Sequence, residues 1–300
     1  MPIAGELAVV APLAAFLGRP LVLVDVGCRW GLDETWAAFG PHIRRIGFDP
    51  DAEECARLER LNGEGARVRF VPAGLGPAVG SSRLHLTREP ACSSLYPPDL
   101  EAMRQRPELS CIEPTGTATI PLTTLDAWAA TDGLDRVDIL KLDTQGSELD
   151  ILRGSERLLP TVRAIEVEVE FNPIYRGQPL FGDVDRFLRD RGFVLWRLGH
   201  LVHYGMAGAR SDFAVEEWQC FDSRALPSPR QGGQLYWAHA YFVRHEAAFP
   251  RPSADWRSRL ADACAFSAFG FRDLAGSCLR HALEDAPRDV APAILAALSD

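Results

Sequence analysis

The sequence predicts an α/β fold with a mostly parallel, doubly wound sheet, an antiparallel last strand and a helical C-terminal segment. Apolar runs typical of strands alternate with helix-periodic segments up to about residue 200. The first of these runs ends in a glycine-containing turn. Beyond Pro252 the sequence becomes rich in Ala and Leu and entirely helical in pattern.

The first half of the chain carries the opening strands of this sheet. The expected elements are strands at 21–26, 46–48 and 68–71, helices from residue 33 and at 51–61, and a hairpin arm at 82–86. Residues 88–118 are rich in Pro, Ser and Thr and predict a long loop. Loops of this length are mostly functional or disordered.

The second half continues the alternation and then changes character. The expected elements are strands at 137–142, 164–171, 193–198 and 236–244, and helices at 147–159 and 181–191. The last strand follows a long connection. The helical pattern after it predicts a small C-terminal appendage. An exposed apolar face on these helices would favour pairing with a second copy or with a partner.

Composition and charge narrow the classes of protein and partner. The chain has 300 residues, of which 47% are hydrophobic, so it can bury a large core. Its net charge is −9, and it has no basic run, which argues against nucleic acid as a partner. The apolar stretch 7–17 is interrupted by Pro12 and is too short to span a membrane.

The seven cysteines are scattered along the chain, and no CxxC pair occurs among them. This pattern argues against a disulfide framework and against a zinc knuckle, and it is typical of a reducing compartment. The sequence therefore predicts a cytoplasmic location.

A glycine turn follows the first predicted strand, in the sequence DVGCRWG from Asp25 to Gly31. In doubly wound sheets the crevice beyond this turn binds the ligand. The spacing lacks the third glycine of the pyrophosphate-binding fingerprint. A tight turn that holds no ligand explains the motif equally well.

Asp49 ends the second predicted strand, in the sequence GFDP, about 20 residues beyond the glycine turn. An acid at this position holds the ribose hydroxyls of a bound nucleoside. The alternative is an Asx-turn that leads into the next helix. Together with the glycine turn, the ribose interpretation is favoured. A nucleoside without a pyrophosphate clamp suggests S-adenosylmethionine (SAM).

The stretch DILKLDTQGSELDILRG, residues 138–154, places Asp143 at the end of a central strand beside the same crevice. It also contains Lys141, the only lysine in the chain. We expect a functional role for Asp143. Glu148 opens the following helix, where it either serves the site or complements the helix dipole.

Three glutamates alternate with apolar residues in the sequence AIEVEVEF, so Glu166, Glu168 and Glu170 share one face of a strand. Buried carboxylates without partners are costly. We expect Glu170, nearest the carboxyl end, to face the crevice and the other two to be structural. His200 and His203 lack a third ligand nearby, so a metal site there is not favoured.

Taken in order, these motifs resemble the FkbM family of SAM-dependent methyltransferases. The segments are VDVGCRWG, GFDP, FVPAGLGPAVGSSRLHL, CSSLYPPD, VDILKLDTQGSELDILRG and IEVEVEFNPIYRGQPLF. The resemblance covers residues 20–200, and GQLYWAHAYFVR (233–244) resembles the closing strand of longer members. It implies a Rossmann-like methyltransferase fold and O-methylation of hydroxyl groups on sugars, glycans or other small metabolites.

The resemblance also implies roles for individual residues. Those expected to bind the cofactor are Asp25, Gly27, Gly31, Asp49, Ala73, Gly74, Leu75 and Asp143. Those expected near the acceptor are Ser93, Ser94, Glu148 and Tyr175. The family more often has Glu where this chain has Asp49. Arg29 and Trp30 replace smaller residues of the glycine turn and are expected to narrow the methionine end of the pocket.

Methyl transfer to an alcohol gains from a group that removes the hydroxyl proton. Asp143 and Glu170 are the candidates, either as a base or as ligands to a divalent ion such as Mg²⁺. The metal-free version is favoured because no third ligand is evident. The resemblance divides the chain into an N-terminal helical segment (1–20), a methyltransferase domain (21–245) and a helical appendage (246–300).

Two other functions remain open at this point. A dinucleotide-dependent oxidoreductase has a related fold, but the missing third glycine weighs against it. A non-catalytic protein that binds a ligand or a partner is the second alternative. The retained acids Asp25, Asp49, Asp143 and Glu148 weigh against it.

Overall fold

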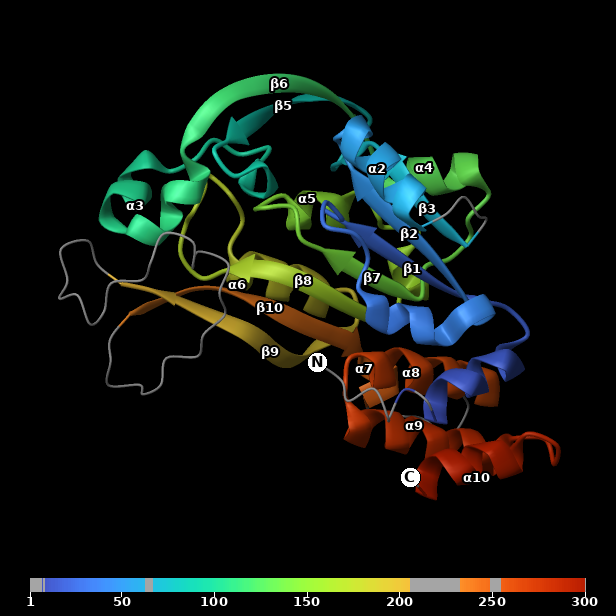
Figure 1. The fold of residues 1–300 in the computed structure, drawn as a ribbon. Coiled ribbons are helices and arrows are strands. Elements are labelled where there is room, and N and C mark those ends of the chain that lie inside the picture. Colours follow the sequence, from blue (N-terminus) through green and yellow to red (C-terminus); the bar gives the residue numbers. More distant parts are fainter. Residues whose placement is uncertain (1–6, 8, 63–66, 206–232, 249–254, 300) are drawn as a thin grey trace.

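A computed structural model describes residue 7 and residues 9–62, 67–205, 233–248 and 255–299 (Figure 1). The strands are β1 (Leu21–Val26), β2 (Ile43–Asp49), β3 (Val68–Pro72), β4 (Gly74–Leu75), β5 (Gly80–Thr87), β6 (Pro114–Thr123), β7 (Ile139–Leu142), β8 (Ala164–Glu170), β9 (Phe193–Tyr204) and β10 (Gln234–Arg244). The α-helices are α2 (Ala52–Asn62), α3 (Leu100–Gln105), α4 (Leu125–Asp132), α5 (Glu148–Arg153), α6 (Phe181–Arg189), α7 (His245–Ala248), α8 (Trp256–Ala268), α9 (Arg272–Asp285) and α10 (Ala291–Ser299).

The main sheet has seven strands in the order β3-β2-β1-β7-β8-β10-β9. The pairs from β3 to β8 are parallel, whereas β10 is antiparallel to both β8 and β9. The predicted fold class is therefore confirmed, including the antiparallel last strand. The strand order reverses between β1 and β7, which places a ligand-binding crevice at their carboxyl ends.

Alternate residues of the central strands enter two separate hydrophobic clusters. Val22, Val24 and Val26 of β1 pack in the cluster that includes buried residues of α4, α5 and α6. Leu21 and Leu23 pack in the other cluster, with the 3₁₀ helices η1 (Ala11–Leu17) and η2 (Glu34–His42) and with α8 and α9. The sheet is thus covered on both faces, as an interior parallel sheet requires.

The C-terminal helices complete one of these two clusters. Leu260, Cys264 and Phe266 of α8 are fully buried and share their cluster with strand residues of the sheet. Arg163, which precedes β8, also contacts Asp262 of α8 at 2.5 Å. Figure 1 shows α8 to α10 gathered against one end of the sheet. The apolar face of this segment, which we expected to be exposed, is therefore covered by the chain itself.

Several elements differ from the sequence prediction for local reasons. The expected helix from residue 33 is the 3₁₀ helix η2, which contains Pro41 and a non-helical Gly40. The expected helix 147–159 ends at Arg153, and Gly154 beyond it packs so close to Gly76 that a Cβ there would lie 2.2 Å from the Gly76 carbonyl oxygen. The segment 88–118 is also not a plain loop. It contains α3, the 3₁₀ helices η3 (Pro90–Cys92) and η4 (Pro107–Ile112), and the start of β6.

A second sheet of three strands, in the order β4-β6-β5, arches over the carboxyl edge of the main sheet (Figure 1). Its long arms β5 and β6 form an antiparallel pair from Gly80 opposite Leu122 to Thr87 opposite Pro114. The predicted hairpin arm is therefore present, and its partner strand begins within the segment that was expected to be a loop. This arch encloses the space above the crevice.

Candidate active site

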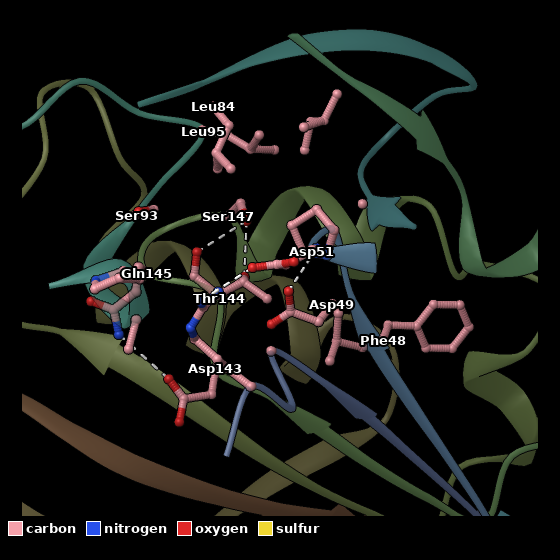
Figure 2. Close-up of a pocket in the computed structure, with 18 of the residues that line it drawn as sticks. Phe48, Asp49, Asp51, Leu84, Ser93, Leu95, Asp143, Thr144, Gln145 and Ser147 are labelled. Atoms are coloured by element: carbon pink, nitrogen blue, oxygen red, sulfur yellow. Dashed lines mark hydrogen bonds and ion pairs between the residues drawn. The ribbon is translucent and has the colours of Figure 1, made fainter. Parts of the chain in front are cut away.

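A cavity of about 690 Å³ lies at the carboxyl ends of β1, β2, β7 and β8, beneath the β5–β6 arch. Its wall toward the main sheet carries polar side chains, among them Asp49, Asp143 and Gln145. Its wall toward the arch is apolar and includes Leu84 and Leu95 (Figure 2). This volume is in the range of pockets that hold a cofactor or a small molecule.

The glycine turn joins the ends of three strands. The amide of Gly27 donates to the Phe48 carbonyl oxygen at 2.9 Å, and a Cβ at this position would lie 1.8 Å from the carbonyl oxygen of Asp143. Only glycine permits that approach, and its φ of +89° is also in the left-handed region. Gly27 lines the cavity, whereas Gly31 closes the turn by donating to the Cys28 carbonyl oxygen at 2.8 Å.

Asp25 lies beneath the turn and is not among the cavity-lining residues. Its carboxylate accepts a hydrogen bond from Lys141 Nζ at 3.2 Å, and the same ammonium group lies 3.7 Å from Asp143. Burial raises the pKa of Asp25 to about 6 and outweighs the opposing effect of Lys141. One cation therefore serves two neighbouring carboxylates.

Asp49 combines both interpretations of its motif. Its Oδ1 accepts a hydrogen bond from the Asp51 amide at 2.8 Å, which is an Asx-turn at the start of α2. The side chain nevertheless lines the cavity, and burial raises its pKa. Ala73, Gly74 and Leu75 line the same cavity near Phe48. The structure thus brings the predicted ribose acid and the predicted adenine segment together.

The residues that replace the smaller ones of the glycine turn also border this cavity. Arg29 pairs with Asp51 at 3.2 Å, and the side chains of both residues line the wall. Trp30 lines the wall too but remains 75% exposed.

Gln145, just beyond β7, organises the polar wall. Its backbone has a φ of +61°, which is strained for a residue with a side chain. The side-chain Nε2 donates to Glu168 at 2.8 Å, and Oε1 accepts from the Tyr175 hydroxyl at 3.0 Å. Such strain persists only where the surroundings hold it, and it is concentrated at functional sites.

Glu148 holds the turn that carries Gln145. Its carboxylate accepts hydrogen bonds from the Thr144 amide at 2.7 Å, the Thr144 hydroxyl at 3.0 Å and the Gly146 amide at 2.9 Å. Burial raises the pKa of Glu148 to about 7. The side chain is buried behind the turn and is not among the residues that line the cavity.

The glutamate stripe on β8 needs one correction. Glu168 lines the cavity, whereas Glu170, which we expected to face it, is buried outside its lining. Burial raises the pKa of both groups well above the usual range. After burial, the negative charge of Asp143 raises the pKa of Glu168 most, and that of Glu148 raises the pKa of Glu170 most. Both residues lie on one face of the strand, so their alternation alone could not distinguish them.

Of the residues predicted to lie near the acceptor, some line the cavity and others are buried behind its wall. Ser93 lines the cavity. Ser94 is buried and donates to the Gln145 carbonyl oxygen at 2.6 Å, while the Tyr175 hydroxyl donates to the Cys92 carbonyl oxygen at 2.6 Å. Ser94 and Tyr175 therefore fasten the 92–94 loop to the turn after β7. They position the wall without forming its surface.

Two aromatic side chains of β10, Trp237 and His239, also line the cavity and were missed in the sequence. His239 Nδ1 lies 2.7 Å from Glu166 Oε1, and its ring lies 5.1 Å from that of His200. Across the described ranges, no group of three or more His, Cys, Asp or Glu side chains is arranged to hold a metal ion. None of the described helices is long and apolar enough to cross a bilayer.

Comparison with known proteins gives a consistent picture. The methyltransferase FkbM domain profile matches residues 30–195. The 2-O-methyltransferase NoeI of Sinorhizobium fredii is 25% identical over 163 residues, which cover 52% of this chain and 66% of NoeI, slightly less than two thirds. Methyltransferase sdnD of Sordaria araneosa is 27% identical over 198 residues, which cover 58% of this chain and 74% of sdnD.

Among solved structures, the magnesium protoporphyrin IX methyltransferase of Synechocystis PCC 6803, with bound SAM, is similar over 80% of both chains. Its TM-score to this chain is 0.36, and the sequence identity is 13%.

Proposed function

The chain belongs to the methyltransferase FkbM domain family, and we propose that it transfers a methyl group from SAM to a hydroxyl group of a small-molecule or glycan acceptor. The observation that carries this proposal is the convergence of Gly27, Asp49 and Asp143 on one cavity at the carboxyl edge of the sheet. In doubly wound sheets this edge is where nucleoside-containing ligands bind.

The residues present fit SAM. Asp49 offers a carboxylate to the ribose, and the apolar wall formed by Phe48, Ala73 and Leu75 suits an adenine ring. Gly27 keeps the turn close to Asp143, and Gly31 closes that turn. Asp25 acts from beneath, through Lys141. When bound, SAM supplies a methyl group on a positively charged sulfur, which is open to attack by an alcohol oxygen.

Of the two acids with a predicted chemical role, Asp143 lines the cavity. We propose that it positions the reacting groups, because alignment of nucleophile and methyl group provides much of the rate enhancement in a displacement. Glu170 is proposed to act indirectly, through the buried carboxyl groups around Glu168 and Glu148. The proposal needs no metal ion.

The arch suggests the character of the acceptor. Leu84 and Leu86 of β5, with Ala118 and Ile120 of β6, line the cavity from above. Burial of apolar surface is worth about 25 cal/mol per Å², so this wall favours an acceptor that carries an apolar group beside its hydroxyl. The transfer to oxygen, rather than to nitrogen or carbon, is supported by the similarity to NoeI, a 2-O-methyltransferase.

The test is transfer of a labelled methyl group from SAM to a panel of hydroxyl-bearing acceptors, with calorimetric titration of SAM and NAD in parallel. We expect SAM binding without NAD binding, and label in an ether linkage. The rate should be unchanged by a chelator. NAD binding, or SAM binding without turnover of any acceptor, would favour the oxidoreductase or the non-catalytic alternative respectively. Loss of activity with chelator and its return with Mg²⁺ would show that a metal ion takes part.

A further inference from the structure

We infer that His239, oriented by Glu166, is the group that accepts the proton of the acceptor hydroxyl. This inference rests on the proposed methyl transfer and adds a catalytic residue to it. His239 lies on β10, and its side chain lines the same cavity as Asp143 and Glu168. It faces Glu168 across the antiparallel β8–β10 pair.

The second ring nitrogen is aligned by a carboxylate. His239 Nδ1 lies 2.7 Å from Glu166 Oε1, and the Tyr241 hydroxyl donates to the same oxygen at 3.2 Å. A carboxylate only accepts hydrogen bonds, so the neutral imidazole carries its hydrogen on Nδ1. The lone pair of the ring is then on Nε2, as a proton acceptor requires. Both side chains are mostly buried, at 15% and 16% exposed, which restricts the ring to this orientation.

The strand irregularity around His239 supports a functional position. The pairing of β10 with β9 shifts register between Trp237 and His239, where β9 has one extra residue, and His200 within this bulge has a φ of +48°. Bulges of this kind redirect side chains and are common beside active sites. The His200 and His239 rings are 5.1 Å apart, so the bulge places a second imidazole behind the first.

The other acids of the cavity wall are less suited to take a proton. Burial opposes ionisation of Asp143, but the pKa of Asp143 lies below its usual value, chiefly because of the Lys141 ammonium group 3.7 Å away. A carboxylate of that kind is a weak base. The pKa of Glu168 is held well above its usual value, first by burial and then by Asp143, and its Oε2 already accepts a hydrogen bond from Gln145 at 2.8 Å. Among the described residues that line the cavity, His239 is the one with an imidazole nitrogen.

These roles define the methyl-transfer step. The hydroxyl proton moves to Nε2 of His239, the oxygen forms its bond to the methyl carbon, and the electron pair of the broken methyl–sulfur bond remains on sulfur. Glu166 stabilises the resulting imidazolium through Nδ1, as the acid of a carboxylate–histidine pair does. The imidazolium then returns its proton to solvent.

Nuclear magnetic resonance of ¹⁵N-histidine-labelled protein tests the pair without an acceptor. His239 is assigned with the His239→Gln variant. We expect the neutral ring to show a protonated Nδ1 and an unprotonated Nε2, and Glu166→Gln to mix the two tautomers. A protonated Nε2 in the parent protein, or no change in Glu166→Gln, would overturn the inference.

Kinetics supply the second readout, with labelled SAM and octyl-β-D-glucoside below its micelle concentration as the probe. His239→Gln should lower kcat by about 10²–10⁴-fold, the usual contribution of a positioned base. SAM affinity should change less than twofold. His85→Gln, on the outer part of β5, is the matched control and should retain the parental rate. A parental kcat in His239→Gln would refute the assignment.

The pH profile separates a base from a merely structural side chain. The titratable groups around His239 are Glu166, Glu168, Asp143, His200 and Tyr241, and the charge of Lys141 acts on Glu166 and Asp143. The acidic limb of the parent kcat profile should disappear in His239→Gln and move to lower pH in Glu166→Gln. If octyl-β-D-glucoside is not methylated by the parent, the proposed acceptor class fails, and the tautomer measurement alone decides on the pair.

Discussion

Two aspartates flank the same central strand, β7, and their surroundings are opposite. Asp138 precedes the strand and lies in the scaffold at its amino end, whereas Asp143 follows the strand and lies on the cavity wall. The two are separated by only four residues, three of them apolar and the fourth Lys141. Their comparison shows how one strand serves both the fold and the site.

At the amino end, positive charge is abundant. Asp138 accepts hydrogen bonds from Arg19 at 2.8 and 2.7 Å, from Arg163 at 3.0 Å and from the Val22 amide at 2.9 Å. Burial alone would raise its pKa, but these partners hold the pKa of Asp138 below its usual value. Arg163 extends the network to Asp262 of α8. Each charge is paired, as a structural ion cluster requires.

At the carboxyl end, positive charge is scarce. Lys141 lies 3.2 Å from Asp25 and 3.7 Å from Asp143, and it serves both. The pKa values of the neighbouring Glu148, Glu168 and Glu170 are all raised, in each case first by burial. Carboxyl groups kept together against their mutual repulsion cost stability and are characteristic of functional sites. The difference in charge balance therefore distinguishes scaffold from site.

The largest expected effect comes from removing the helical layer at the amino end. Truncation after residue 250 deletes Leu260, Cys264 and Phe266, which are fully buried, and leaves Arg163 without Asp262. We expect loss of the cooperative thermal transition in circular dichroism. From the sequence alone we expected the truncated chain to keep its cofactor affinity and to change only its assembly. Parental SAM affinity after truncation would support that view and the predicted boundary at residue 245.

The two aspartates themselves should differ in their effect on stability. Asp138→Asn leaves Arg19 and Arg163 without their buried partner, which should lower the free energy of unfolding by about 3–5 kcal/mol. Asp143→Asn removes one of several crowded acids and should change it by less than about 1 kcal/mol. Urea denaturation of both variants measures the contrast. Equal losses would mean that charge balance does not separate the two ends.

Carboxyl groups with raised and with lowered pKa values should also respond to pH with opposite sign, and Asp143 belongs with Asp138 because the pKa of each is lowered. The folded-state pKa values of Asp25 and Glu148 are raised to about 6 and about 7, so protonation favours the folded protein. Their contribution is complete below the unfolded pKa values and is lost as pH rises through about 6 and 7. The lowered pKa of Asp138 acts in the other direction, and its contribution is lost as the solution becomes strongly acidic.

Urea denaturation at pH 5 and pH 8 measures this dependence. We expect the parent to be less stable at pH 8 by roughly 4 kcal/mol. Glu148→Gln should be less stable at both values, because its amide NH₂ cannot accept the hydrogen bond from Gly146. Its stability should nevertheless depend less on pH. If the free energy of unfolding of Glu148→Gln changed with pH as much as that of the parent, Glu148 would be excluded as a source of the pH dependence.

Much of the fold was predictable because local patterns determine it. The apolar runs of β1, β7 and β8 give their strands, and the rule that ligands bind at the carboxyl edge brings Asp49 and Asp143 to one site. The β5–β6 arch was not predictable as a whole, since β6 pairs with β5 across a segment rich in Pro and Ser. Long-range pairing leaves no local signal there.

The missed site residues have the same cause. Alternation places Glu166, Glu168 and Glu170 on one face, but only the position of the cavity shows that Glu168 lines it. His239 comes to Glu166 because β10 inserts between β8 and β9 in antiparallel register. The glutamate stripe was evident in the sequence, but His239 and Glu166 are 73 residues apart, so the sequence alone did not reveal that they form a pair.

The central claim is that SAM binds at the carboxyl end of the sheet, where positive charge is scarce. Its most direct test is calorimetric titration of SAM into the parent and Asp49→Ala. Loss of a charge-assisted hydrogen bond should weaken binding by about 1.5–3 kcal/mol, roughly 10- to 150-fold. Asp185→Ala, on the outer helix α6, is the matched control and should bind as the parent does. Equal affinity of all three proteins for SAM, or no binding by the parent, would contradict the account.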